Sequence, residues 1–238
     1  MTNFFKAVII DRTAPFGAIK KLNDLSILTV LSTKVDKIIT DLSTHPDMQI
    51  FQIQPNTFVC EPTVYDYYVR NLSLYGVKVL KGATSLTSKY PEDIAYNAVR
   101  IGDFIIHRAD KTDDVIKREF LDRIVNVRQG YTKCSICKVS ENAVITSDEG
   151  IAAVLKNNGV DVLLISHGGI KLSGFDYGFI GGCSGLIASD VLAFCGDITR
   201  HCDYGRISAF LYKHNVSALS LSDGELTDVG SIIGIGSD

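Results

Sequence analysis

Cys134 and Cys137 form a C-x-x-C pair, a spacing used by redox-active dithiols and by half of many zinc sites. A redox-active thiol is favoured at a helix N-terminus, which lowers its pKa. Here the pair lies in an alternating run, residues 131–139, which predicts a strand in which residues three apart face opposite ways. No second C-x-x-C or histidine pair lies nearby to complete a zinc site. The pattern therefore favours a structural role, with one thiol buried and the other on the opposite face.

Cys183 is a second candidate, because it follows Gly181 and Gly182 and these glycines leave room for a ligand or for backbone. A nucleophilic cysteine needs a base within reach. His167 and His201 are the nearest histidines in sequence, and neither forms a recognisable motif with it. Packing is the favoured interpretation, and a nucleophilic role for Cys183 with His201 stays as the weaker alternative.

Two histidines each stand two residues before an aspartate, in His45-Pro46-Asp47 and in His201-Cys202-Asp203. Such pairs can bind a metal or exchange protons. Asp is also favoured at turns and at helix N-termini. We expect capping rather than metal binding at both places, and we predict no metal site and no cofactor.

The composition limits the kinds of partner. The 238 residues include 24 basic and 27 acidic residues, which gives a net charge of −3 with no basic block, so nucleic acid is not expected. The longest apolar runs have the length of a strand and are too short for a membrane span. No export signal is visible at the N-terminus, so we expect a cytoplasmic protein with reduced cysteines. No linker divides the chain, which predicts one domain over residues 1–238.

An internal repeat organises the whole chain. Each copy has a short apolar strand, a polar turn, a segment of helical periodicity and a second apolar strand. The five copies of strand, helix and strand fall at residues 7–11, 18–22 and 27–31; 58–61, 65–72 and 76–80; 104–107, 114–121 and 124–127; 143–146, 151–155 and 160–165; and 192–197, 206–212 and 216–221.

A further apolar segment follows the second strand of each copy and would add a third strand to each unit. These segments are residues 48–53, 93–101, 134–139, 170–180 and 231–233. Five such units closed in a ring would leave no sheet edge exposed and would surround a narrow central channel. An ordinary open, doubly wound sheet is the alternative, but no glycine-rich phosphate loop follows the first strand. The sequence thus predicts a fivefold pseudo-symmetric α/β propeller.

Polar residues close the first strand of each copy. They are Asp11, Glu61, His107, Thr146 and Asp197. In a closed ring they would gather at one mouth of the channel, and their carboxylates would suit a cationic ligand such as an amine or a guanidinium. The alternative is that polarity simply resumes where strands end.

Asp93 and Asn97 are expected to join that pocket, supported by the turn at Gly181 and Gly182. In a strand these two residues are four apart and share a face, where they would offer acceptors and donors to a planar cationic group. An N-cap at Asp93 for a helix over residues 94–100 is the competing interpretation. We favour the strand, because Gly102 and Asp103 would then form a hairpin into residues 104–107.

The fivefold repeat resembles the pentein, or guanidino-group-modifying-enzyme, fold, and the whole chain is similar to a bacterial branch of that superfamily. Residues 90–103 look like the family's strand that carries Arg and Asp and precedes a Gly-Asp turn. Residues 180–183, Ile-Gly-Gly-Cys, look like its Glu-Gly-Gly-Asn/Asp strand, and Asp148 and Asp203 stand at its helix-opening turns. The resemblance implies a site for a guanidinium group, with Asp93 as its carboxylate.

The chain departs from the catalytic pattern of that family. Family members attack a guanidinium carbon with a cysteine near the C-terminus, where this chain has Gly230, Ser231 and Ile232. Ile180 replaces the acidic residue of the Gly-Gly motif, and no His-x-Asp motif ends a second strand. We therefore predict a protein that binds a small cationic or guanidino-type metabolite at the axial pocket. A hydrolase that uses another nucleophile, such as Cys183, and a non-catalytic structural or interaction protein are the alternatives, and the oligomeric state is left open.

Overall fold

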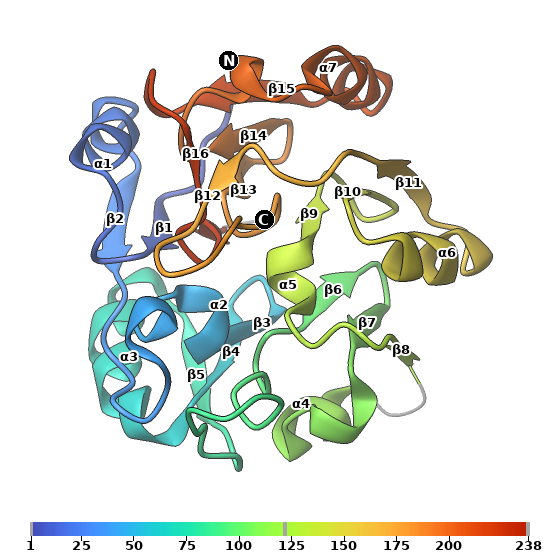
Figure 1. Ribbon diagram of the computed structural model, residues 1–238. Coiled ribbons are helices and arrows are strands. Elements are labelled where there is room, and N and C mark those ends of the chain that lie inside the picture. Colours follow the sequence, from blue (N-terminus) through green and yellow to red (C-terminus); the bar gives the residue numbers. More distant parts are fainter. Residues whose placement is uncertain (1, 121–122, 237–238) are drawn as a thin grey trace.

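The computed structural model describes residues 2–120 and 123–236 as five three-stranded sheets and one two-stranded sheet. Each three-stranded sheet has the same order, with a central strand between an antiparallel and a parallel neighbour. The sheets are set around the middle of the molecule, and the longer helices lie outside them (Figure 1). The fold is thus mixed α/β and is built from many small sheets.

The central strands correspond to the first strand of each predicted copy and are almost wholly buried. They are β1 (Ala7–Ile10), β4 (Thr57–Cys60), β7 (Phe104–His107), β10 (Ala143–Thr146) and β14 (Val191–Phe194). A helix leads from each to a parallel outer strand. The helices are α1 (Phe16–Asp24), α3 (Tyr65–Leu72), α4 (Asp114–Glu119), α6 (Glu149–Asn157) and α7 (Tyr204–Lys213). The outer strands are β2 (Leu28–Leu31), β5 (Lys78–Lys81), β8 (Ile124–Asn126), β11 (Asp161–Leu164) and β15 (Ser217–Ser220).

The antiparallel neighbours of the central strands lie towards the middle of the molecule, and we call them the inner strands. They are β3 (Ile50–Gln54), β6 (Val99–Ile101), β9 (Ile136–Lys138), β13 (Ser184–Ala188) and β17 (Ile233–Ile235). Two four-residue helices, α2 (Pro46–Gln49) and α5 (Thr132–Ser135), lead directly into β3 and β9. The small sheet pairs β12 (Ile170–Lys171) with β16 (Leu226–Thr227).

The fourth unit shows how the sequence specifies each element. The Asp148 side chain accepts a hydrogen bond from the Ile151 backbone N–H (2.8 Å) and caps α6, as its position before the helix predicts. Ile151 and Leu155 then face the sheet and are buried with its strands. Gly159, at φ +78°, ends the helix in the left-handed conformation that glycine tolerates best.

Three of the predicted inner strands are wrong in extent. Residues 170–180 contain only the two-residue strand β12, and the inner strand of the fifth unit is β13, because Gly181 and Gly182 belong to a turn before it. Residues 131–135 form α5 and its approach rather than a strand, and Cys134 and Cys137 are both buried. Asp93 to Asn97 are likewise turns rather than strand or helix, although the predicted hairpin at Gly102 and Asp103 is confirmed.

The two ends of the chain meet in one sheet. The C-terminal strand β17 pairs with β1 in register Ala7 to Ile235, and β13 packs against β17. In the described residues no helix is both long and apolar enough to cross a bilayer.

Gly185 on β13 tests how closely the inner strands pack. A Cβ at this position would lie 1.8 Å from the Ile232 backbone oxygen, which cannot move without disturbing β17. We expect Gly185→Ala to lower the free energy of unfolding by about 1–3 kcal/mol, the usual cost of overpacking a core. Gly205→Ala on α7 is the matched control, because nothing lies within 4 Å of its Cβ and alanine favours a helix by up to about 1 kcal/mol. Urea unfolding of both variants measures the difference, and equal stabilities would contradict the close approach of β13 and β17.

Candidate functional site

A buried polar cluster lies where four of the inner strands begin. Its members are Asp47 of α2, Asn97, Cys134 of α5 and Ser231, and each stands two or three residues before an inner strand. Cys134 Sγ (3.1 Å) and the Ser231 hydroxyl (2.8 Å) both donate to Asp47 Oδ2. The Asn97 amide nitrogen reaches Cys134 Sγ at 3.1 Å. All four residues are at most 5% exposed, so the cluster is shielded from solvent.

Lys133 extends the cluster by one further contact. Its Nζ donates to Ser231 Oγ (3.0 Å), so Lys133, Ser231 and Asp47 form a continuous chain of hydrogen bonds. Asp47 Oδ1 is buried and has no hydrogen-bond partner among the described residues. A buried carboxylate oxygen without a partner is costly and marks a place where a donor would be stabilising.

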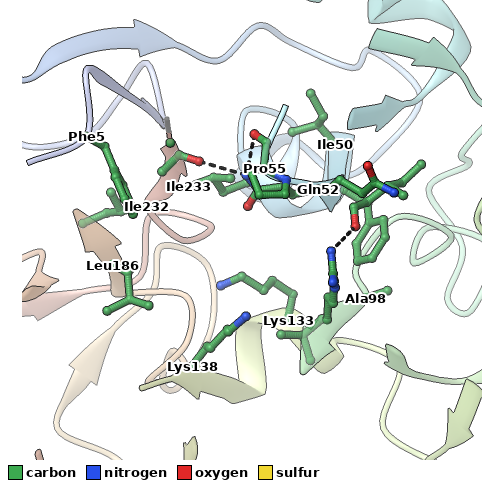
Figure 2. A pocket seen from close by; sticks show the side chains of 18 of the residues that line it. Phe5, Ile50, Gln52, Pro55, Ala98, Lys133, Lys138, Leu186, Ile232 and Ile233 are labelled. Atoms are coloured by element: carbon green, nitrogen blue, oxygen red, sulfur yellow. Dashed lines mark hydrogen bonds between the residues drawn. The ribbon is translucent and has the colours of Figure 1, made fainter. Parts of the chain in front are cut away.

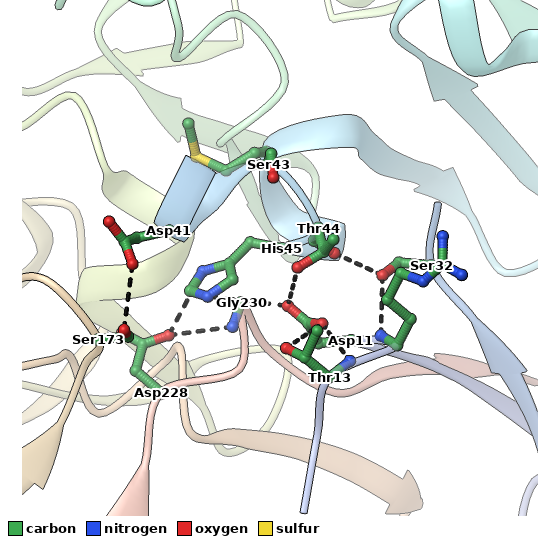
Figure 3. A network of polar contacts seen from close by, with 12 residues as sticks. Asp11, Thr13, Ser32, Asp41, Ser43, Thr44, His45, Ser173, Asp228 and Gly230 are labelled. Atoms are coloured by element: carbon green, nitrogen blue, oxygen red, sulfur yellow. Dashed lines mark hydrogen bonds and ion pairs between the residues drawn. The ribbon is translucent and has the colours of Figure 1, made fainter. Parts of the chain in front are cut away.

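A second polar layer lies beside the cluster. Figure 3 shows the His45 ring between the carboxylates of Asp11 and Asp228, each with one oxygen 3.8 Å from a ring nitrogen. Asp228 also accepts hydrogen bonds from the backbone N–H groups of Phe179 (2.9 Å) and Gly230 (3.0 Å). Burial is the main cause that raises the pKa of Asp228 to about 6, while His45 acts in the opposite direction.

A cavity of about 530 Å³ opens on the body of the inner strands, and residues from all five of them line it. Phe5, Leu186, Ile232 and Ile233 contribute an apolar wall, and the long side chains of Lys133 and Lys138 extend towards the space (Figure 2). We call this space the axial cavity.

The charged lining of the axial cavity is mostly cationic. The lining contains three cationic side chains, those of Arg100, Lys133 and Lys138, and one carboxylate, Glu141, which forms an ion pair with Lys138. Arg100 instead donates to neutral carbonyl oxygens, from Nη1 to Ile53 (2.9 Å) and from Nε to Gly102 (2.9 Å). Burial is the main cause that lowers the pKa of Lys138, which reports a cation held partly away from water.

Residues 9–233 match a family model described as "Family of unknown function (DUF6873)". The chain belongs to this family. No curated protein matches it.

Solved structures resemble the chain over nearly its whole length. SxtG, an amidinotransferase from Microseira wollei in the saxitoxin biosynthetic pathway, has a TM-score of 0.58 and 10% identity, over 98% of this chain and 95% of that chain. Inosamine-phosphate amidinotransferase StrB1 from Streptomyces griseus has a TM-score of 0.59 and 11% identity, over 98% and 94%. A dimethylarginine dimethylaminohydrolase has a TM-score of 0.55 and 10% identity, over 91% and 92%. These neighbours have the pentein fold, so the resemblance seen in the sequence is confirmed for the fold. Identities this low show the fold alone.

The polar residues that close the central strands serve their own turns. Asp11 accepts from the backbone N–H (2.7 Å) and hydroxyl (2.8 Å) of Thr13. Glu61 and Asp197 make the same pair of contacts with the threonine two residues later. Asp11, Glu61 and Asp197 therefore repeat one turn motif, and a further contact, from the Thr44 hydroxyl to Asp11 (2.9 Å), joins Asp11 to the His45 layer.

His107 lies at the corresponding strand end of the third unit. Its Nδ1 is 2.8 Å from the Thr112 hydroxyl, and it is fully buried. Burial is the main cause that lowers the pKa of His107 to about 4, so the ring is neutral at neutral pH. A neutral buried ring offers no charge to a ligand.

Asp93 and Asn97 are buried in different surroundings. Asp93 accepts a hydrogen bond from the Tyr131 hydroxyl (2.7 Å), and burial is the first cause that raises its pKa. Asn97 belongs to the polar cluster, where its Oδ1 accepts from the Lys133 backbone N–H (2.8 Å).

Gly181 and Gly182 allow close packing of the polar cluster. A Cβ on Gly181 would lie 2.3 Å from the Lys133 backbone oxygen, and one on Gly182 would lie 2.1 Å from Asp228 Oδ1. The space beside them is therefore filled by other parts of the chain. Cys183, the next residue, is fully buried, and burial together with Asp228 raises its pKa well above the usual value.

The ligand atoms of His201, Cys202 and Asp203 lie within 4.8 Å of one another, close enough to hold a metal ion. His201 Nδ1, however, accepts a hydrogen bond from the Asp203 backbone N–H (3.1 Å), and Asp203 itself binds the Ser166 backbone N–H (2.6 Å) and Arg206 (2.8 Å). These contacts engage His201 Nδ1 and both carboxylate oxygens of Asp203 beside the start of α7. Asp203 stands at the N-cap position of α7, but its side chain makes no capping hydrogen bond, so the expected cap is wrong there. Asp47 differs from the expected cap, because its side chain joins the polar cluster rather than the end of a helix.

None of the ten candidate residues from the sequence lines the axial cavity, as far as the described residues show. These residues are Asp11, Glu61, Asp93, Asn97, His107, Gly181, Gly182, Cys183, Asp197 and His201. Sequence reasoning missed Lys133, Lys138 and Arg100 on the cavity, and it considered Asp47 of the cluster but expected it to be a cap. One signal was present, since Lys133 and Lys138 flank the C-x-x-C pair, and lysine side chains are almost never fully buried, so both had to reach open space.

Asp228 predicts a pH dependence of stability with a defined sign. Its folded pKa of about 6 lies above the unfolded value of about 3.9, so the folded state binds more protons between these pH values. The free energy of unfolding therefore falls as the pH rises through this window. We expect the stability advantage of the wild type over Asp228→Asn to shrink by about 2 kcal/mol between about pH 4.5 and pH 7.5.

Urea unfolding at the two pH values measures this change. Asp190→Asn is the control, because Asp190 is exposed. The difference in the free energy of unfolding between the wild type and this variant should stay nearly constant. A constant difference for Asp228→Asn would show that this carboxylate is charged throughout the range.

Proposed function

We propose that the five units close into a single pseudo-fivefold propeller and that the axial cavity is the binding site of this protein. The pairing of β17 with β1 supports closure, since it joins the last strand of the chain to the first. Contacts of β13 with β9 and β17, and of β3 with β6, support an arrangement of inner strands around one axis. In such a ring the cavity lies on the axis, where each unit contributes a wall.

The ligand we propose is a small metabolite with an anionic group, such as a carboxylate or a phosphate. The observation that carries this proposal is the excess of cations on the cavity wall. Among the described residues neither Arg100 nor Lys133 has a carboxylate within ion-pair distance, and only Lys138 is neutralised, by Glu141. Charge-assisted hydrogen bonds to such cations contribute about 1.5–3 kcal/mol each.

The shape of the cavity supports a ligand with an apolar body. Phe5, Leu186 and Ile232 form a wall away from the lysine ammonium groups (Figure 2). A volume of about 530 Å³ is within the range of small-molecule sites. An aromatic or branched aliphatic carboxylate fits both the charge and the apolar wall.

A cationic or guanidino-type ligand is the second candidate. The structural neighbours are named for amidino and guanidino substrates, and the buried oxygen of Asp47 without a partner would accept from such a group. That oxygen lies in the closed cluster rather than on the cavity wall, so the anionic ligand is favoured. Catalysis by Cys183 is less favoured still, because burial keeps its thiol protonated.

Ligand-induced thermal stabilisation distinguishes these candidates. We expect benzoate, succinate or inorganic phosphate to raise the Tm, while agmatine and methylguanidine at equal concentration leave it unchanged. Lys133→Met and Lys138→Met keep the apolar stem and remove the charge, and each should weaken binding about tenfold or more.

Lys156→Met is the matched control, because Lys156 is exposed on the outer helix α6. Stabilisation by the guanidines alone would favour the second candidate. Stabilisation by neither class would leave the structural or interaction protein as the better proposal.

A further inference from the structure

Ser231 has a backbone conformation that its position in the chain does not explain. It is one of three residues other than glycine with positive φ in the described part of the chain, at +73°. The other two, Ser26 and Asn215, stand just past the ends of α1 and α7, where left-handed residues are common. Ser231 follows no helix, and the preceding Gly230 is left-handed as well, at +63°. Strain of this kind persists where the surrounding structure holds it, and it concentrates at functional sites.

The hydroxyl of Ser231 is held between a proton donor and a proton acceptor. Lys133 Nζ donates to Oγ (3.0 Å), and the hydroxyl has two acceptors within reach, Asp47 Oδ2 at 2.8 Å and the Gly181 carbonyl oxygen at 3.0 Å. A carboxylate in this place can accept the hydroxyl proton as Oγ attacks, and the ammonium that donates to the same oxygen stabilises negative charge on it.

We propose that Ser231 is a nucleophile that attacks an acyl carbon of a ligand in the axial cavity, with Asp47 as proton acceptor and Lys133 as the stabilising cation. The substrate class is a carboxylic ester or amide that also bears an anionic group. This inference rests on the proposed function, because the ligand must enter through that cavity.

Lys133 connects the cavity to the nucleophile. Its side chain lines the cavity and its ammonium group contacts Oγ, while the next residue after Ser231, Ile232, is part of the cavity wall. Ser231 itself is fully buried beneath these side chains. The approach of a ligand to Oγ therefore requires a shift of the flexible Lys133 side chain, which lies between the cavity and the hydroxyl.

The chemical step is balanced by the groups present. Oγ forms a bond to the acyl carbon, the hydroxyl proton passes to Asp47, and the bond from that carbon to the leaving alcohol or amine breaks. The leaving group takes the proton from Asp47. Water then hydrolyses the acyl-serine, which releases the carboxylic acid and restores the Ser231 hydroxyl.

A fluorophosphonate probe tests the nucleophile directly, since its phosphorus forms a bond to a reactive serine and fluoride leaves. We expect peptide mass spectrometry of the full-length wild type to locate the adduct on Ser231, which needs no variant. Ser231→Ala should abolish labelling. Asp47→Asn should slow it by about a hundredfold or more, as expected for loss of a general base.

Ser135→Ala is the matched control, because Ser135 is another fully buried serine, whose hydroxyl donates to the Tyr131 carbonyl oxygen (2.8 Å). In the Ser135→Ala variant, the probe should label Ser231 at the wild-type rate. An adduct on any other residue, or none on Ser231 in protein that benzoate stabilises, would overturn the nucleophile and leave the binding proposal intact. Absence of both labelling and ligand stabilisation would overturn the two together.

Discussion

The buried carboxylate of Asp47 is the interaction on which the centre of the structure depends. A polar side chain that is 1% exposed is stable only if the surrounding chain supplies hydrogen-bond partners, and here the two donors come from segments 87 and 184 residues away in sequence. Cys134 and Ser231 meet at one of its oxygens, and Asn97 donates to its backbone carbonyl (3.2 Å). These hydrogen bonds to Asp47 bring the starts of four inner strands together. The carboxylate therefore helps to determine how the units pack against one another, in addition to the chemical role proposed for it.

The region where the inner strands begin and the cavity along their length differ in charge. Where the strands begin, Asp11, Asp47 and Asp228 gather with one histidine, and the group is closed from solvent. Along the body of the strands, cations outnumber carboxylates and a cavity remains. The region that the sequence marks as acidic therefore contains no cavity. The charge of the proposed ligand is instead inferred from the cationic side chains that line the cavity along the strands.

Local periodicity was enough to predict the central strands, the helices and the outer strands, because each copy repeats the same apolar pattern within about 25 residues. The inner strand of the fifth unit was misplaced because residues 170–180 are apolar, yet the close packing of Gly181 and Gly182 puts the turn later. The polar cluster could not be found in this way. Asp47, Asn97 and Ser231 each look like ordinary turn residues, and only the tertiary structure brings them into contact.

The polar cluster also favours a hydroxyl over a thiolate at the centre of this fold. A thiolate needs a neighbouring cation, whereas Asp47 and burial raise the pKa of Cys134 well above its usual value. Burial has the same effect on Cys183 and Cys195, with Asp228 adding to it in both. A serine hydroxyl has the opposite requirement, because it becomes nucleophilic when a nearby carboxylate accepts its proton. The acidic surroundings that keep the cysteines protonated are thus the ones that a serine nucleophile requires, which agrees with the role proposed for Ser231.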